Sequence, residues 1–498
     1  MTPPTTGNDL LVAGGHLLRL DGSLERADVW IEDGAIVAVG VGLKPGPGAQ
    51  TLDASSMLIA PGLINAHMHS GENFNPGVYE NLPLDLWFVR SHQVTRDEPP
   101  SREAIYVRTL LGAMLMLRSG TTTAVDFLYE APQITLETLE PVVAAYRDAG
   151  MRATILLGVA DLPYMSSLPL TDDAAAGAAA LEAPPPTCEQ IMTLARAAVD
   201  RFHEPGGMIG IGLGPSAPQR CSPELMEQTM ALARERKLVW QTHVLETRTQ
   251  VLTARERHDG HSFVEVLDER GLLGERATLV HTVWLTDRDI EIMRSTGTAA
   301  VHCLLSNLRL GDGVARLPAL LRAGVRVALG TDGRGCMETL DMLELARMTA
   351  LMHKVRGGDY TQWPTATQAL RMATRDASPC AGHGEHLGRI EPGARGDLIL
   401  MPRDAPAFTP LHHGARQLVY GASAGDVHTV LVDGRVVVAE GRALGIDHQW
   451  LMARVERYAA EALAGERGAD ADVLEQLVGE AYAWADEQPL ELDAYLRR

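Results

Sequence analysis

Two histidines separated by a single residue, His67 and His69, stand at the end of an apolar segment and can hold one metal ion between them. Side chains two positions apart on a β-strand point to the same face, so both imidazoles face the same way. His243, His281 and Asp332 each stand at the end of another short apolar segment. Imidazole nitrogens with one carboxylate suit Zn²⁺, and also Fe²⁺ or Mn²⁺. The alternative is a set of ordinary surface or core histidines.

Residues so far apart in the sequence meet only if the fold brings the ends of their segments together. Short apolar strands alternate with helical stretches such as Ala104–Leu117 and Pro223–Arg236, which is typical of a parallel α/β domain. Eight such units in roughly 320 residues fit an α/β fold of the (β/α)8 TIM barrel type, whose C-terminal rim collects residues from distant strands. A doubly wound sheet is the structural alternative. The eight predicted strands are Leu63–His67, Thr122–Phe127, Thr154–Val159, Ile209–Leu213, Leu238–His243, Thr278–His281, Ala299–His302 and Val325–Thr331.

Hairpin patterns occur near both ends of the chain. Asp33-Gly34 and Asp433-Gly434 each separate two β-branched apolar runs. They predict a small composite β-sandwich domain formed by residues 1–58 and 386–445, with the metal-dependent barrel at residues 59–385 between them. We expect residues 446–498 to form a helical segment that covers the barrel. The Ala/Pro-rich stretch Ala174–Pro186 is predicted to be a mobile loop.

The composition limits the kind of protein and its partners. Of the 498 residues 46% are hydrophobic and 22% are charged, so the chain can bury a large core. Its formal net charge of −20 argues against nucleic acid and anionic membranes as partners. Five widely spaced cysteines without a Cys-x-x-Cys pair indicate reduced thiols. Because no basic stretch precedes an apolar run at the start and no apolar run has spanning length, we expect a soluble, cytoplasmic protein.

Several motifs resemble those of the amidohydrolase superfamily. The resemblance extends from about Asp9 to Gly441 and is strongest to the triazine hydrolase and aminohydrolase branch, with cytosine, guanine and methylthioadenosine/adenosylhomocysteine deaminases as relatives. It implies a barrel with a composite β-sandwich, the same architecture that the periodicity predicts. The motifs are Pro61–His69, the His243-x-x-Glu246 pair, Ser306–Gly311, Gly330–Gly333 and Gly393–Leu398.

The resemblance also implies a role for each candidate residue. One divalent metal ion per chain, Zn²⁺ in the first instance with Fe²⁺ or Mn²⁺ as alternatives, would have four ligands: His67, His69, His243 and Asp332. Glu246 would be the proton shuttle, and His281 a base that touches the metal-bound water or the substrate. A zinc-bound water has a pKa of about 7, which provides hydroxide at neutral pH. The hydroxide would attack the ring carbon that carries an amine, while Asp332 takes the water's proton and Glu246 protonates first a ring nitrogen and then the leaving group.

The lysines decide how many metal ions we expect. Some related barrels bind two metal ions bridged by a carbamylated lysine on the fourth strand. Lys44, Lys237 and Lys354 are the only lysines, and the fourth predicted strand, Ile209–Leu213, has none. Lys237 precedes His243 by six residues, which puts it roughly 20 Å from the rim at about 3.3 Å per residue. We therefore predict a single metal ion.

Loops after the strands are expected to hold the substrate, and the candidate contacts are Asn73, Trp87, Arg96, Ser216 and Asn307. In nucleoside-specific members of the family a glutamate, an arginine and a histidine hold the nucleoside. An ungapped alignment puts Arg96, Leu157 and Ser216 at these three positions. An arginine only donates hydrogen bonds, so it cannot accept them from ribose hydroxyls. We therefore expect methylthioadenosine, adenosylhomocysteine and adenosine to be poor substrates, and the true substrate to lack ribose. Arg96 could meet an anionic or carbonyl group on such a substrate.

Together these observations predict a metal-dependent hydrolase that deaminates a nitrogen heterocycle and releases ammonia or an amine. Two alternatives keep the site but change the reaction, either to removal of a halide or another group from a triazine-like ring or to hydrolysis of an amidine. A non-catalytic scaffold is a third alternative, and the presence of all four ligands and both acid–base residues argues against it. We expect a small-molecule heterocyclic substrate and, from the resemblance, a homo-oligomer.

Overall fold

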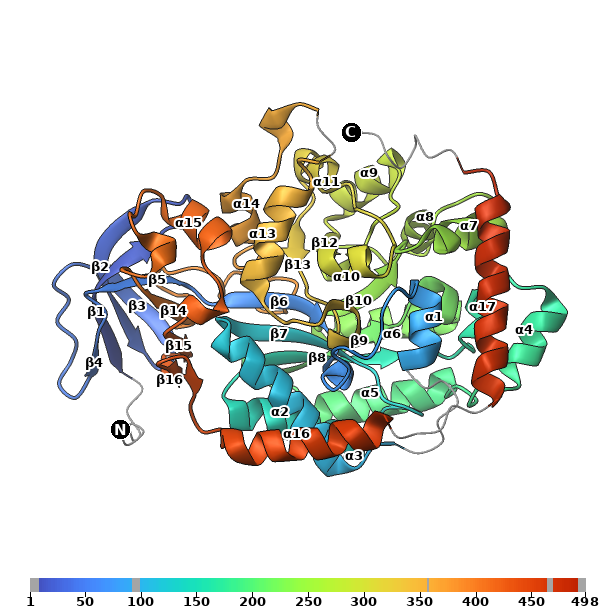
Figure 1. Cartoon of the computed structure of the whole chain (residues 1–498), viewed down its shortest axis with the longest axis horizontal. Coiled ribbons are helices and arrows are strands. Elements are labelled where there is room, and N and C mark those ends of the chain that lie inside the picture. Colours follow the sequence, from blue (N-terminus) through green and yellow to red (C-terminus); the bar gives the residue numbers. More distant parts are fainter. Residues whose placement is uncertain (1–8, 92–98, 356–357, 464–468, 491–498) are drawn as a thin grey trace.

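The computed structural model describes residues 9–91, 99–355, 358–463 and 469–490. Its centre is a sheet of eight parallel strands in the order β13-β12-β11-β10-β9-β8-β7-β6, surrounded by helices (Figure 1). This arrangement confirms the predicted barrel, and each predicted strand is present with its ends shifted by no more than a few residues. The strands are β6 (Leu63–Met68), β7 (Thr121–Leu128), β8 (Arg152–Val159), β9 (Ile209–Pro215), β10 (Trp240–Val244), β11 (Ala277–His281), β12 (Ala299–His302) and β13 (Val327–Leu329).

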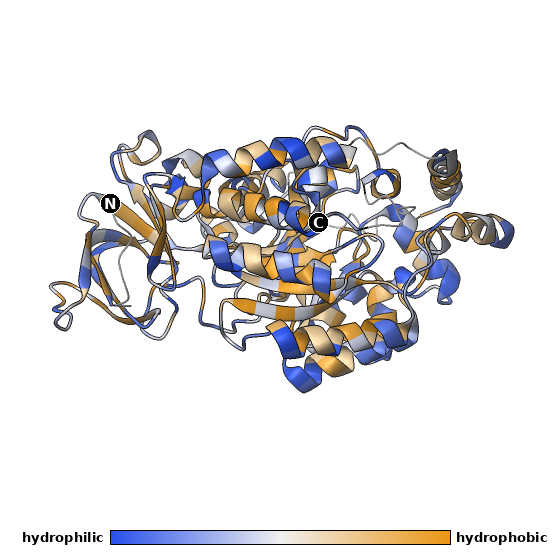
Figure 2. Cartoon of the chain, turned by 90° about the horizontal axis from the view of Figure 1, so that it is seen from below, coloured by the Kyte–Doolittle hydropathy of each residue, from blue (hydrophilic) through white to orange (hydrophobic). Residues whose placement is uncertain are grey.

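Both faces of these strands are buried, which explains their nearly continuous apolar sequence. The barrel interior holds small side chains, such as Ala66 and Ala328, together with a few larger ones, such as Phe127 and Leu156. The opposite strand faces pack against the helices in a separate apolar cluster. In Figure 2 the strands at the centre are mostly hydrophobic, whereas polar residues gather on the outer helices.

The side chain of Asn65 links the first barrel strand to the residues that follow the last one. The amide of Asn65 on β6 donates a hydrogen bond to Thr331 Oγ1 (2.7 Å), and its Oδ1 accepts one from the backbone N–H of Thr331 (3.0 Å). Gly330 permits this approach, because a Cβ atom at this position would lie 2.9 Å from the Cβ of His67. The barrel therefore closes next to the residues that precede the metal-ligand candidates.

A second, mixed sheet combines strands from both ends of the chain. Its order is β17-β16-β15-β14-β5-β1-β2-β3, with β4 paired to β1. The two predicted hairpins are present, and Asp33-Gly34 and Asp433-Gly434 adopt positive φ at both residues, as a tight two-residue hairpin turn requires. The strands are β1 (Leu10–Leu18), β2 (Leu24–Glu32), β3 (Ala35–Gly40), β4 (Gln50–Asp53), β5 (Met57–Pro61), β14 (Leu398–Pro402), β15 (Thr429–Val432), β16 (Arg435–Ala439) and β17 (Arg442–Ala443).

A buried charge cluster joins this sheet to the barrel. Arg152, at the start of β8, is fully buried and forms ion pairs with Asp397 and Asp433. Asp433 also accepts a hydrogen bond from Arg395 Nε at 2.6 Å. Removing one member would leave a buried charge without its partner, which costs several kcal/mol, about 3 to 5 in measured cases.

The helices follow the strands in alternation through the barrel. One prediction was wrong: Ala174–Pro186 is not a loop throughout, because α4 covers Asp172–Ala179. Thr171 caps this helix, two aspartates stand in its first turn, and alanine has the highest helix propensity. The longer helices are α1 (Leu84–Ser91), α2 (Arg102–Arg118), α3 (Leu136–Ala149), α5 (Cys188–Phe202), α6 (Pro223–Arg236), α7 (Arg248–Arg257), α9 (Asp287–Thr296), α13 (Met342–Met352) and α15 (Gly414–Gly421). Shorter ones are α8 (Phe263–Glu269), α10 (Leu304–Arg309), α11 (Leu317–Ala323), α12 (Arg334–Met337) and α14 (Ala366–Met372).

Two C-terminal helices pack on the outside of the barrel, α16 (His448–Leu463) along α2 and α17 (Ala469–Glu487) against α1 (Figure 1). Arg90 of α1 pairs with Glu475 of α17 at 2.7 Å, and apolar residues of both helices share one buried cluster. The C-terminal segment thus lies near the rim that carries the candidate site. No helix among the described residues has both the length and the apolarity needed to cross a membrane.

Candidate functional site

The candidate metal ligands meet at the C-terminal rim of the barrel, where β6, β10 and β13 end. His67 Nε2 and His69 Nε2 lie 3.7 and 3.1 Å from Asp332 Oδ1. Ligand atoms of His67 also lie within 4.8 Å of those of His243 and His281. All of these side chains are buried or nearly so, and they therefore do not form a solvated cluster on the surface.

Each imidazole of the cluster is oriented by a hydrogen bond on its other nitrogen. The Nδ1 partners are Gln241 Oε1 for His67 (2.6 Å), the Phe127 carbonyl oxygen for His69 (2.6 Å) and the Ser216 carbonyl oxygen for His243 (2.7 Å). This pattern is usual for metal-binding histidines, because it fixes the tautomer and the ring orientation. His67 Nε2 is buried and has no hydrogen-bond partner. The ligand atoms of His67, His69 and Asp332 lie within 4.8 Å of one another, as do those of His67, His243 and His281, and imidazole nitrogens with a carboxylate fit a divalent cation such as zinc.

The pKa shifts of the cluster agree with the binding of a cation. Burial lowers the pKa of His67 to about 3, so this imidazole is neutral and able to bind a cation. Burial also acts to lower the pKa of His69, but the hydrogen bond with Asp332 and the charge of Glu72 outweigh it and raise the value to about 9. Burial acts to raise the pKa of Asp332, and its contacts with His69 hold it well below the usual range. A cation at this place would replace the proton of His69.

Strained backbone surrounds the same rim. His281 and Asp332 both have φ of 68°, a left-handed conformation that residues other than glycine rarely adopt. Ser306 Oγ donates to Asp332 Oδ2 at 2.6 Å, and the backbone N–H of Gly333 donates to Oδ1 at 2.8 Å. These contacts hold the carboxylate in one orientation as the strand ends.

The acid–base candidates lie beside the cluster. Glu246 Oε1 is 3.3 Å from His281 Nδ1, and that nitrogen also lies 2.9 Å from Asn307 Oδ1. Burial raises the pKa of Glu246 well above its usual range, and the carboxylates of Asp312 and Asp332 add to this effect. Burial lowers the pKa of His281. Burial therefore favours the protonated form of the Glu246 carboxyl group, which can donate a proton, next to the neutral form of the His281 imidazole.

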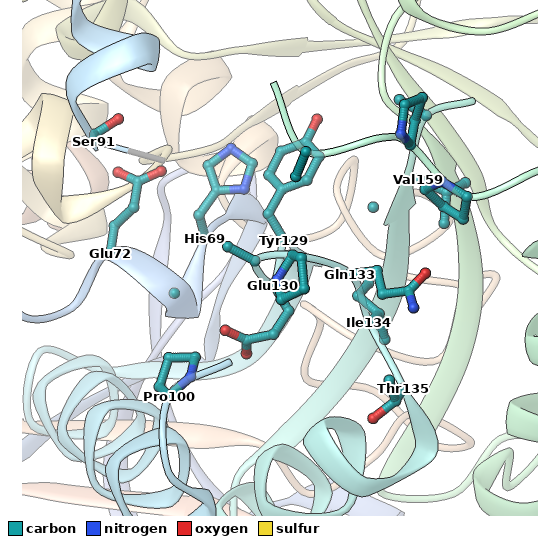
Figure 3. A pocket seen from close by; sticks show the side chains of 18 of the residues that line it. His69, Glu72, Ser91, Pro100, Tyr129, Glu130, Gln133, Ile134, Thr135 and Val159 are labelled. Carbon is teal, nitrogen blue, oxygen red and sulfur yellow. The ribbon is translucent and has the colours of Figure 1, made fainter. Parts of the chain in front are cut away.

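Two cavities lie above these residues. An inner chamber of about 60 Å³ is lined by His243, Glu246, His281 and Asp332, and an outer cavity of about 1190 Å³ extends from it towards α3 and α5. Figure 3 shows the outer cavity with the imidazole of His69 next to the ring of Tyr129 and the carboxyl group of Glu72. The residues that line both spaces are His69, Phe88, Tyr129, Tyr164 and Arg220.

Some of the predicted substrate contacts line a cavity, and others do not. Trp87 and Ser216 line the inner chamber. Asn73 lines neither cavity, because its amide is buried and donates to the Arg108 carbonyl oxygen at 2.9 Å. Asn307 likewise lines neither cavity and contacts His281 instead. Arg96 lies outside the described residues.

Several residues at the site were not predicted from the sequence. Glu72 is buried near His69 and accepts a hydrogen bond from the backbone N–H of Gly335 (3.1 Å), and burial raises its pKa to about 8. Tyr129 stacks on His69 at 5.4 Å between ring centroids. Asp312 follows the Ser306–Gly311 motif directly and approaches Glu246. The available signal was position, since polar or aromatic residues that come soon after a strand of the barrel reach its rim.

An eight-stranded parallel barrel with buried histidines and a carboxylate at its rim is an arrangement that can hold a catalytic metal ion. The sequence pattern described as "Amidohydrolase family" matches residues 58–437, which is most of the chain. The chain belongs to the amidohydrolase family, and it is a hydrolase.

Curated relatives cover nearly the whole chain. The 5'-deoxyadenosine deaminase of Methanothermobacter thermautotrophicus is 32% identical over 460 residues, which are 92% of this chain and 97% of the relative. The 5-methylthioadenosine/S-adenosylhomocysteine deaminase of Desulforudis audaxviator is 32% identical over 459 residues, 90% of this chain and 98% of the relative. Both similarities extend over the barrel and the second sheet.

Solved structures agree with the fold. An adenosine deaminase from Xanthomonas campestris with bound zinc has a TM-score of 0.80 and 26% identity, over 92% of this chain and 99% of that one. An atrazine chlorohydrolase from Arthrobacter aurescens TC1 complexed with zinc has a TM-score of 0.82 and 26% identity, over 90% of this chain and 100% of that one. Zinc is thus present in two similar structures.

Proposed function

We propose that this protein is a zinc-dependent deaminase that hydrolyses the bond between a ring carbon and an exocyclic amine of a nitrogen heterocycle, with adenine nucleosides as the first class to test. The observation that carries the proposal is the position of the Glu246 carboxyl group, which is buried 3.3 Å from His281 and beside the histidine cluster, where burial favours its protonated form. The activities named for the curated relatives support the choice of substrate class.

His67, His69, His243 and Asp332 would hold the metal ion. When bound, the ion supplies a Lewis acid that lowers the pKa of a water molecule to about 7. Glu246 donates its proton to the ring nitrogen next to the carbon under attack, and later carries a proton to the departing amine. Asp332 accepts a proton from the attacking water, and the neutral imidazole of His281, whose Nδ1 donates to Asn307 Oδ1, would accept a hydrogen bond from that water through Nε2 and so orient it.

The sequence-based expectation that adenine nucleosides are poor substrates depended on three positions. Arg96 is outside the described residues, and Leu157 packs with the outward-facing core between strand and helices, away from both cavities. Ser216 alone of the three is placed at the site. One local position is a weaker argument than similarity over nine-tenths of the chain, so adenine nucleosides come first among the candidates.

A second candidate reaction is hydrolysis of another leaving group on a triazine-like ring. The specific observation in its favour is the similarity to the atrazine chlorohydrolase structure. The same ligand set can serve both reactions, because the metal ion and the general acid act on the ring and not on one particular substituent.

The test is a substrate panel with zinc-loaded protein. Adenosine, 5'-deoxyadenosine, methylthioadenosine, cytosine, guanine and an s-triazine carrying either an amine or chloride are each assayed for ammonia and chloride release. We expect ammonia release at kcat/KM of about 10⁴ M⁻¹s⁻¹ or more on at least one amino-substituted ring, within the usual enzyme range. The Glu246→Gln variant serves as the inactive control. Chloride release without ammonia release on any member would favour the second candidate and contradict the first.

A further inference from the structure

Arg220 occupies the boundary between the inner chamber and the outer cavity. It follows β9 at the end of the short helical turn Pro218–Arg220, and it is among the residues that line both spaces. Its Nη1 donates to Ser216 Oγ at 2.8 Å, and the same oxygen lies 2.7 Å from the hydroxyl of Tyr129. Since Tyr129 stacks on His69, the guanidinium group is two side chains away from a metal-ligand candidate.

Aromatic faces hold this guanidinium group in place. Its central carbon lies 4.4 Å from the centre of the Phe88 ring and 4.7 Å from that of Tyr164. These two rings stack on each other, with centroids 4.2 Å apart and planes inclined by 6°. Stacking of this kind orients an arginine side chain without using its N–H donors.

Most of those donors have no partner among the residues that the structure describes. A guanidinium group has five N–H donors, and the hydrogen bond to Ser216 uses one of them. The Nε atom is buried without an acceptor, and among the described residues no carboxylate oxygen lies within 4 Å of the side chain. Because Arg220 is partly exposed and lines both cavities, its remaining donors are available to an acceptor that arrives with a ligand.

The nearest acidic groups are turned to other partners. Burial raises the pKa values of Asp85 and Glu182, and the positive charge of Arg220 acts to lower them. The two oxygens of Asp85 accept hydrogen bonds from the hydroxyls of Tyr164 and Tyr482. Those of Glu182 accept from the backbone N–H groups of residues 164 and 165, at 2.7 and 2.9 Å. Among the described residues, Arg220 thus has acidic groups nearby but no hydrogen bond or ion pair to either Asp85 or Glu182.

We propose that Arg220 binds a carboxylate group carried by the substrate, with the ring to be hydrolysed directed to the inner chamber. This assignment rests on the proposed function, because it names the substrate group that the same site recognises. A carboxylate matches the planar end of a guanidinium group with two parallel hydrogen bonds. The preferred substrate is therefore an amino-substituted heterocycle with an anionic substituent that reaches the junction of the two cavities.

The experiment compares matched pairs of probes that differ by a carboxylate. The pairs are 5'-deoxyadenosine with adenosine 5'-carboxylate, and cytosine with cytosine 5-carboxylate. Zinc-loaded wild type, Arg220→Gln and Arg90→Gln are each assayed for ammonia release and for binding by titration calorimetry. Arg90 is the matched control, because it lines the same outer cavity but is already paired with Glu475.

We expect wild type to favour the carboxylated member of at least one pair by about 10- to 100-fold, the usual range for a hydrogen bond to a charged group. Arg220→Gln should abolish this preference, change the neutral member less than about threefold, and leave the melting temperature at or above that of wild type. Arg90→Gln should keep the preference. A lower melting temperature with equal losses on both members would identify Arg220 as structural and overturn the proposal.

The two proposals fail in different ways. Turnover of the neutral probes without a preference for carboxylate in either rate or binding overturns the role of Arg220 and leaves the deaminase function intact. Carboxylate-dependent binding that Arg220→Gln removes, without ammonia release from any probe, overturns the deaminase function and retains the anion site. Absence of carboxylate-dependent binding in wild type overturns the role of Arg220 in every case.

Discussion

The backbone N–H of Asp332 donates a hydrogen bond to the carbonyl oxygen of His67 at 3.0 Å. The residues belong to opposite ends of the barrel sheet, since His67 lies on β6 and Asp332 follows β13. The bond therefore closes the barrel between two of its metal-ligand candidates. We therefore expect a change that weakens the closure of the barrel also to weaken the binding of a metal ion.

Asn65→Ala tests this link. The substitution removes both hydrogen bonds to Thr331 and leaves buried groups without partners. We expect the free energy of unfolding to fall by about 2 to 4 kcal/mol and zinc affinity to fall with it, as measured by urea denaturation and by competition with a chelator. Gln228→Ala, which removes an exposed helix contact to Glu224, is the control. Unchanged zinc affinity in a destabilised Asn65 variant would contradict the link.

Glu246→Gln should keep the fold and the metal ion but lower kcat by at least about 100-fold, because a positioned general acid–base contributes that much or more. The amide is close in size to the carboxyl group but cannot transfer its proton. Metal analysis and steady-state rates on the best substrate from the panel provide the measurement. A variant with the wild-type rate would remove Glu246 from the mechanism.

The pH dependence should reveal the coupling between Glu246 and Asp312. Because the acid must be protonated, activity is present below the raised pKa of Glu246 and is lost as the pH rises through it. Asp312→Asn removes a negative charge that helps to raise this pKa, so the basic limb of the kcat/KM profile should move to lower pH. A basic limb that stays in place would show that another group controls it.

Metal removal should abolish activity reversibly. Dialysis against a chelator removes the ion, and added Zn²⁺ should restore the rate in proportion to the metal bound per chain, up to one ion. Asp332→Ala should lose both metal and turnover, because the same carboxylate serves as ligand and base. Full activity of metal-free protein would contradict the proposed function as a whole.

Tyr482→Phe tests how the C-terminal helix affects substrate choice. The hydroxyl of Tyr482 donates to Asp85 Oδ2 at 3.0 Å, and its loss frees this oxygen to pair with Arg220. We expect the preference for carboxylated probes to fall by about 3- to 10-fold while neutral probes react as before, since the new pair competes with the substrate. Tyr106→Phe, which removes a hydroxyl bonded to Asp148 on the outer helices, is the control. An unchanged preference for carboxylated probes would exclude competition between Asp85 and the substrate for Arg220.

Much of the architecture could be predicted from the sequence because periodicity reports burial directly. The barrel strands are one example, because their apolar segments reflect burial on both faces. The two Asp-Gly hairpins are another, because their turns depend on contacts within a few residues. Leu157 shows the limit of this reasoning, since side chains alternate along a strand and one residue decides between the barrel interior and the outer core.

The histidine and aspartate candidates were predicted because their types and motifs are distinctive. Arg220, Asp312 and Tyr129 were not, since each takes its meaning from neighbours that are distant in sequence. Arg220 is a candidate because Phe88 and Tyr164 stack on it and the nearest carboxylates are bonded elsewhere. Such relations exist only after folding, and no local pattern reports them.

The pairing of β5 with β14 has a consequence for synthesis on the ribosome. β5 ends at Pro61, whereas its partner begins at Leu398, and the two strands pair in antiparallel register. The ribosome adds roughly 5 to 20 residues per second, so the edge of β5 that pairs with β14 stays unpaired for on the order of 20 to 70 s. During that time an apolar strand with unpaired backbone groups is open to wrong partners. The nascent chain should therefore be a client of chaperones until its last strands emerge.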